Sequence, residues 1–98
     1  MAYSGTVTWT HQGTLVAGSV DTVTFTAGHY GLALFNKSAG DVYFNTNVQG
    51  TAAPVLATNE TYCVRAASLS PVVLQFRDQV TVVRVIAAGA NEYGVEGR

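Results

Sequence analysis

Hydrophobic and polar positions alternate with a period of two in several short runs of the chain. The clearest runs are Thr6–Thr10, Asp21–Thr26 and Val80–Ile86. β-Branched residues in strict alternation favour half-buried strands, because successive side chains of a strand point to opposite faces of the sheet. No segment keeps the 3.6-residue period of an amphipathic helix. The pattern therefore predicts an all-β protein.

Turn-forming residues divide the chain into candidate strands. We expect turns at His11–Gly13, Ala17–Ser19, Ala27–His29, Arg77–Gln79 and Ala88–Asn91, a tight hairpin at Ser38–Asp41, and one long loop at Thr46–Asn59. This spacing predicts one domain, residues 1–98, folded as an antiparallel β-sandwich or jelly-roll-like barrel of about 7–9 short strands. The expected strands are Thr6–Thr10, Thr14–Ala17, Thr22–Thr26, Gly31–Asn36, Asp41–Asn45, Thr61–Arg65, Val72–Arg77, Val80–Ala88 and Glu92–Val95.

The strand Val80–Ala88 is apolar on both faces, whereas Val72–Arg77 has one polar face. Val82 and Ile86 lie on one face of Val80–Ala88, together with Arg84, and the opposite face is also apolar. We expect a central strand covered on both sides, with a neighbouring subunit on the outer face as the alternative. In either arrangement Arg84 needs a carboxylate or carbonyl partner unless it lies exposed at the end of the strand.

Composition changes the picture by its shortage of charge. Only 11% of the residues are charged, 48% are hydrophobic and the net charge is −1. The exterior is then either a solvated neutral surface rich in Thr, Ser, Asn and Gly, or a surface partly buried against partners. A net charge near zero argues against nucleic acid as a partner, because such proteins carry a basic stripe.

Candidate catalytic and metal-binding groups are sparse. Cys63, the single cysteine, is expected as a small buried side chain in a strand, and His11 and His29 are expected in turns without further ligands at metal-binding spacing. There is no phosphate-binding glycine loop and no nucleophile elbow. Neither a signal peptide nor an apolar run of membrane-spanning length is visible. The prediction is a protein that is not an enzyme and uses no cofactor or metal.

Carbohydrate binding requires aromatic rings that face the solvent, so the expected orientation of each aromatic residue bears on this function. Trp9 and the four phenylalanines fall on strand positions that predict mostly core side chains. Four tyrosines could present their rings outward, although a tyrosine beside a turn usually packs with only its hydroxyl in water. They are Tyr30, Tyr43, Tyr62 and Tyr93.

From Asp21 onward, about three-quarters of the chain resembles small structural proteins of tailed bacteriophages, particularly those that infect actinobacteria. The resemblance lies in an ordered set of segments, each weakly specific alone. A Gly/Ala/Pro loop lies at Thr46–Asn59; its Ala53-Pro54-Val55 departs modestly from the Thr/Ser-Pro loop common in such proteins. The other segments are Val20–Phe25, Leu32–Asn36, Asp41–Asn45, Glu60–Ala67 and Val83–Gly97.

The resemblance implies a β-sandwich capsid decoration (cement) or minor structural protein of the virion. Its expected place is the outer surface of the phage head, after synthesis in the bacterial cytoplasm. Its expected partner is the major capsid protein, with a homotrimer favoured and no nucleic acid or membrane bound. The alternatives are a tail or head–tail connector component, and a carbohydrate-binding module on the virion surface.

The candidate contact elements are a terminus and the long loop, because such segments most often carry interactions. They are Met1–Thr10, within a possible N-terminal contact extension over residues 1–12, and Thr46–Asn59. The candidate subunit or capsid contact residues are Tyr3, Trp9, Val48, Pro54, Val55 and Arg84.

Overall fold

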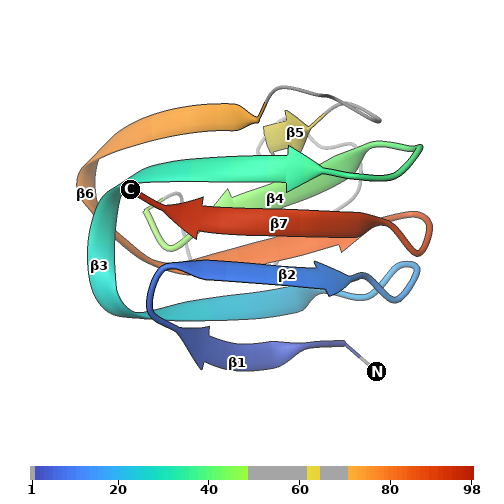
Figure 1. Ribbon diagram of the computed structural model, residues 1–98, viewed down its shortest axis with the longest axis horizontal. Helices are drawn as coiled ribbons and strands as arrows, with labels where there is room; N and C mark the ends of the chain where they lie inside the picture. The colour runs from blue at the N-terminus through green and yellow to red at the C-terminus, as the bar shows by residue number, and fades with distance from the viewer. Residues whose placement is uncertain (1, 49–61, 65–70) are drawn as a thin grey trace.

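The computed structural model describes residues 2–48, 62–64 and 71–98, and these form seven strands and no helix (Figure 1). The prediction of an all-β fold is confirmed. Among the described residues, no helix is long and apolar enough to cross a membrane. The strands are β1 Ser4–Val7, β2 Thr10–Thr14, β3 Asp21–Asn36, β4 Val42–Thr46, β5 Tyr62–Val64, β6 Val72–Ala87 and β7 Glu92–Gly97.

All seven strands belong to one sheet, with the order β2-β7-β3-β6-β4-β5 and with β1 beside β3. The β1–β3 pair is parallel and the other pairs are antiparallel. The sheet folds back on itself into a sandwich. The first layer contains β2, β7, the C-terminal half of β3 and the N-terminal half of β6. The second layer contains β1, the other halves of β3 and β6, β4 and β5.

The strands β3 and β6 are each 16 residues long and are shared by both layers. Asp21–Thr24 pairs with Val82–Val85 in the second layer, and Gly31–Leu34 pairs with Val72–Gln75 in the first. Between them the register shifts on both sides of His29, which marks a β-bulge or irregularity. Both strands turn together here, at the left of Figure 1. This bent pair explains why fewer and longer strands are present than the sequence pattern indicates.

The core lies between the two layers and is built by alternate residues of each strand. Val23 and Phe25 of β3 face it in the second layer, and Leu32 and Leu34 of the same strand face it in the first. Phe25 and Leu32 are an odd number of residues apart, so the period-two alternation changes phase between them, at the register shift around His29. The other large core residues are Leu15, Val42, Phe44, Val64, Val80, Val83, Val85, Tyr93 and Val95.

One carboxylate is buried among these apolar side chains. Asp21, at the start of β3, is only 1% exposed. Its Oδ2 accepts a hydrogen bond of 2.7 Å from the Tyr93 hydroxyl, and its Oδ1 accepts one of 2.9 Å from the backbone N–H of Tyr3. Tyr93 lies in the first layer, so this bond joins the two layers directly. Burial, reinforced by the hydrogen bond to Asp21, raises the pKa of Tyr93 and keeps its hydroxyl a donor.

The central position expected for Val80–Ala88 is confirmed, since this half of β6 lies between β3 and β4. The expected cover on both sides is not found, because Val82 and Arg84 on the outer face are only half-buried. Several expected turns are wrong, because they lie inside strands. His11–Gly13 belongs to β2, Ala27–His29 to the bend of β3, and Arg77–Gln79 to the bend of β6. Sequence alone marks these glycine-containing or charged segments as turns, although a bend in two paired strands uses the same residues.

The expected hairpin at Ser38–Asp41 is also wrong, because β3 and β4 do not pair. The segment Ser38–Asp41 connects the end of β3, in the first layer, to the start of β4, in the second layer. Gly40 takes a positive φ of 93° there, a conformation that side chains disfavour. Cys63 lies in a strand, as expected, but is exposed rather than buried.

Removing the Tyr93 hydroxyl tests the role of the buried carboxylate. Tyr93→Phe keeps the ring and leaves Asp21 Oδ2 without its donor. We expect the free energy of unfolding to fall by about 1–3 kcal/mol in urea denaturation, because a buried charged acceptor loses its partner. Tyr30→Phe, which removes a hydroxyl from an exposed ring, is the control and should change little. Equal stabilities of the two variants would contradict this account of the core.

Candidate functional site

The bend of β3 and β6 lies beside the β1–β2 turn, and together they form one end of the molecule. We call this end the bend edge and define it as Thr8–Trp9, Ala27–Tyr30 and Arg77–Gln79. One contact joins two of its segments, since His29 Nε2 lies 3.0 Å from the carbonyl oxygen of Thr8. Two more connect the bend edge to adjoining strand residues: the N–H of Gly97 donates to the carbonyl of Trp9 at 2.8 Å, and His29 pairs with Val80.

Trp9 is the most exposed large hydrophobic residue of the bend edge, with 58% of its surface accessible. Its indole nevertheless lies on a buried support. The Trp9 and His29 ring centroids are 4.6 Å apart, and the His29 ring meets the edge of Phe25 at 4.9 Å and 82°. His29 is only 6% exposed. Because a carbonyl oxygen only accepts, the contact with Thr8 requires a proton on His29 Nε2.

Gly97 makes room for this support. A Cβ at Gly97 would overlap the ring of His29, so a side chain there would displace the imidazole. Gly97 also donates the backbone hydrogen bond that holds Trp9. The backbone of Trp9 is therefore held by β7, and its exposed indole packs against the ring of His29.

A second exposed aromatic residue, Tyr30, lies on the same edge with 54% of its surface accessible. Arg77 and Asp78 are also exposed there, in the bend of β6. The bend edge thus presents two large aromatic side chains beside a pair of opposite charges. Aromatic and arginine side chains are the residues most enriched at the centres of protein interfaces.

Tyr3, a predicted contact residue, contacts the interior of the protein. It is half-buried, and its ring stacks on His11 with centroids 4.0 Å apart and an interplanar angle of 19°. Its backbone N–H and C=O bind Asp21 and Thr22 of β3. Burial lowers the pKa of His11, and the negative charge of Asp21 partly opposes this shift.

Of the remaining predicted contact residues, Val48 and Arg84 lie among the described residues, and neither belongs to the bend edge. Val48 is half-buried and packs against the core. Arg84 is half-buried on the outer face of the second layer. Its Nη1 is buried and has no hydrogen-bond partner among the described residues, so the expected carboxylate or carbonyl partner for that atom is not found in this part of the chain. Pro54 and Val55 lie outside the described residues.

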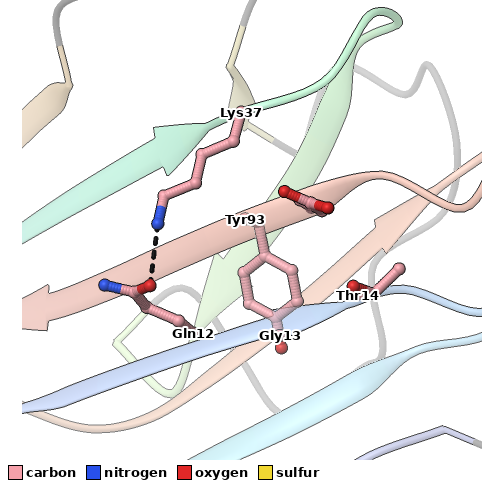
Figure 2. Close-up of a pocket in the computed structure, with 6 residues that line it drawn as sticks. Gln12, Gly13, Thr14, Lys37 and Tyr93 are labelled. Atoms are coloured by element: carbon pink, nitrogen blue, oxygen red, sulfur yellow. Dashed lines mark hydrogen bonds between the residues drawn. The ribbon is translucent and has the colours of Figure 1, made fainter.

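A different feature occupies the outer face of the first layer, where two shallow hollows lie side by side. Their volumes are about 240 Å³ and 190 Å³, and both are lined by Gln12 and Lys37. The Lys37 ammonium donates a hydrogen bond of 2.8 Å to Gln12 Oε1, so the two side chains meet across β7 (Figure 2). Gly94 of β7 lines the second hollow between Gln12 and Phe35. We call the two hollows together the Gly94 groove.

Residues of this groove and the support of Trp9 were missed by sequence reasoning. The segment Glu92–Glu96 carried a usable signal, because its alternation places Glu92, Gly94 and Glu96 on one face, with a glycine between two acidic residues. No such signal marks His29 or Gly97. Their role depends on the bend of β3 and on the approach of β7, which are tertiary features.

Among the described residues, no group of three or more His, Cys, Asp and Glu side chains is placed to hold a metal ion. Comparison of the chain with protein families, with curated proteins and with solved structures gives no match. The site is therefore interpreted from its own geometry.

Substituting Gly97 tests whether Trp9 is held by the support beneath it. Gly97→Ala forces His29 to move, and we expect a loss of about 1–3 kcal/mol in the free energy of unfolding. Trp9 is the single tryptophan of the chain, so its fluorescence should shift as the indole loses its contact. Gly89→Ala, in an exposed turn, is the matched control and should stay within about 0.5 kcal/mol. An unchanged spectrum and stability for Gly97→Ala would refute the support.

The lowered pKa of His11 predicts a dependence of stability on pH. The unfolded chain takes up a proton on His11 more readily than the folded protein, so the free energy of unfolding should decrease as the pH falls from about 7 to about 5. His11→Gln removes this titration and should flatten that part of the profile. Urea denaturation at several pH values measures both proteins, and parallel profiles would show that His11 does not contribute.

Proposed function

We propose that the protein is a virion structural protein, a capsid decoration (cement) protein that binds the outer surface of a tailed-phage head and stabilises contacts between capsomers. The ordered segments from Asp21 onward support the family, and the all-β sandwich is the fold that the resemblance implies. The proposed partner is the major capsid protein of the same virion. A homotrimer is the proposed assembly.

The observation that carries a docking function is the state of Trp9. Trp9 is 58% exposed, yet its indole packs against the buried His29 ring and its backbone carbonyl accepts the hydrogen bond from Gly97. A side chain that is already ordered loses little conformational freedom on binding, so more of its burial contributes to affinity. Tryptophan is also the residue type most enriched among binding hot spots. The bend edge is therefore the proposed contact surface.

The scarcity of charge supports the same proposal. Only 11% of the residues are charged, and the net charge is −1. Neutral Thr, Val and Ala surfaces can be buried against a capsid without the large desolvation penalty of unpaired charges. The paired layers supply a rigid platform, and such a platform is what a protein that bridges capsomers requires.

Binding to purified heads tests the proposal. Trp9→Ala should weaken binding about 30-fold, because loss of a hot-spot side chain removes about 2 kcal/mol of binding free energy. The experiment titrates heads that lack the protein with each variant and measures the bound fraction after sedimentation. Val16→Ala is the matched control, since Val16 is 38% exposed but lies in the β2–β3 loop, at the other end of β2.

Two results would contradict the proposal. Wild-type protein that does not bind the heads would exclude decoration of the capsid. Binding by Trp9→Ala with wild-type affinity would exclude the bend edge as the contact surface.

A further inference from the structure

We propose that the Gly94 groove binds a neutral oligosaccharide. This inference goes beyond capsid decoration and does not rest on it, because the groove lies on the outer face of the first layer rather than at the bend edge. It is carried by three properties of the groove: its shape, its polar groups and its charge.

The shape of the groove follows from a missing side chain. Gly94 lies between Gln12 of β2 and Phe35 of β3, and a Cβ there would meet Gln12 Cγ and Phe35 Cδ2 at 3.7 and 3.6 Å. These are ordinary van der Waals distances, so a Cβ would fit at this position and close packing does not require the glycine. A glycine in the middle of a paired strand otherwise weakens the sheet, and it often marks a place where a ligand approaches closely.

The size of the groove suits a ligand built of small linked units. Hollows of about 240 Å³ and 190 Å³ are smaller than the 300–1,000 Å³ typical of pockets for drug-sized ligands. Because they share Gln12 and Lys37, they are adjacent and not separate sites. Each has the room for a single sugar ring, and two linked rings would lie along β7.

The polar groups around the groove match the hydroxyls of a sugar. Both donors and acceptors line it, and they come from β2, from β7 and from Lys37 at the end of β3, which the sheet holds side by side. A sugar hydroxyl both donates and accepts, so it can pair with every group of this set. The half-buried Phe35 adds an apolar surface on which the C–H face of a sugar ring packs. The polar groups are the Gln12 amide, the Lys37 ammonium, the hydroxyls of Thr10 and Thr14, and the carboxylates of Glu92 and Glu96.

The charges disfavour an anionic ligand. Two carboxylates and one ammonium give the groove a net charge of −1, and the ammonium already donates to Gln12. The Glu96 carboxylate also forms an exposed ion pair of 3.0 Å with Arg98. Both cations beside the groove are already engaged, Lys37 with Gln12 and Arg98 with Glu96, so an acidic glycan would have to compete for them, whereas a neutral glycan does not. These observations favour a neutral glycan over a sulfated or uronic acid polymer.

The test uses the full-length protein and defined probes. Glucans, mannans, galactans and arabinans of two to six sugar units are titrated in NMR or calorimetry experiments, with a sulfated glycan and an oligolysine peptide as comparison probes. We expect at least one neutral oligosaccharide to bind and the sulfated glycan not to bind. Gly94→Val, which fills the groove, should weaken that binding at least tenfold.

Two further variants keep the test decisive. Gln12→Ala changes only an exposed side chain and should also weaken binding, so the proposal can be judged even if Gly94→Val alters the fold. Thr6→Val adds a valine to an exposed position of β1, away from the groove, and should bind as wild type does. The proposal is overturned if no neutral probe binds, if only the oligolysine peptide binds, or if Gly94→Val and Gln12→Ala both retain wild-type affinity.

Discussion

The bent pair of β3 and β6 is the constraint on which the rest of the structure depends. Each strand contributes one half to each layer, so the backbone hydrogen bonds of a single antiparallel pair hold both sheets of the sandwich. Every other strand, apart from β2 and β5, pairs directly with one of these two. The bend leaves core residues inward on both of its sides, from Val23 to Leu34, which closes one apolar interior.

The same bend determines where the surface features lie. It places His29 under the β1–β2 turn, where the imidazole supports Trp9, and it leaves Tyr30 in the solvent. The C-terminal half of β3 then continues beside β7 and forms the face that carries the Gly94 groove. The Asp21–Tyr93 hydrogen bond fastens the layers far from the bend. One rigid framework thus presents an aromatic edge and a polar face.

Period-two alternation was sufficient to predict the all-β fold and the position of the second half of β6 inside the sheet, because burial in a sheet follows that period. It also grouped Trp9 with side chains expected mostly in the core, whereas Trp9 is exposed. It did not predict the bend, since Gly28 and the charged pair Arg77–Asp78 resemble turn residues. It also misplaced His11 and His29, whose strands continue through glycine-containing segments. Trp9 was found among the candidate contacts, but the buried rings that hold it depend on pairing between distant segments, which local pattern does not encode.

Native-state hydrogen exchange of the free protein tests the central claim, that one bent pair unites the two layers. If it does, the core amides in both halves of β3 and β6 exchange only by global unfolding and share one opening free energy. Val23 and Val83 report on the second layer, and Leu34 and Leu74 on the first. A lower opening free energy for one layer than for the other would show that the layers unfold independently and would contradict the account.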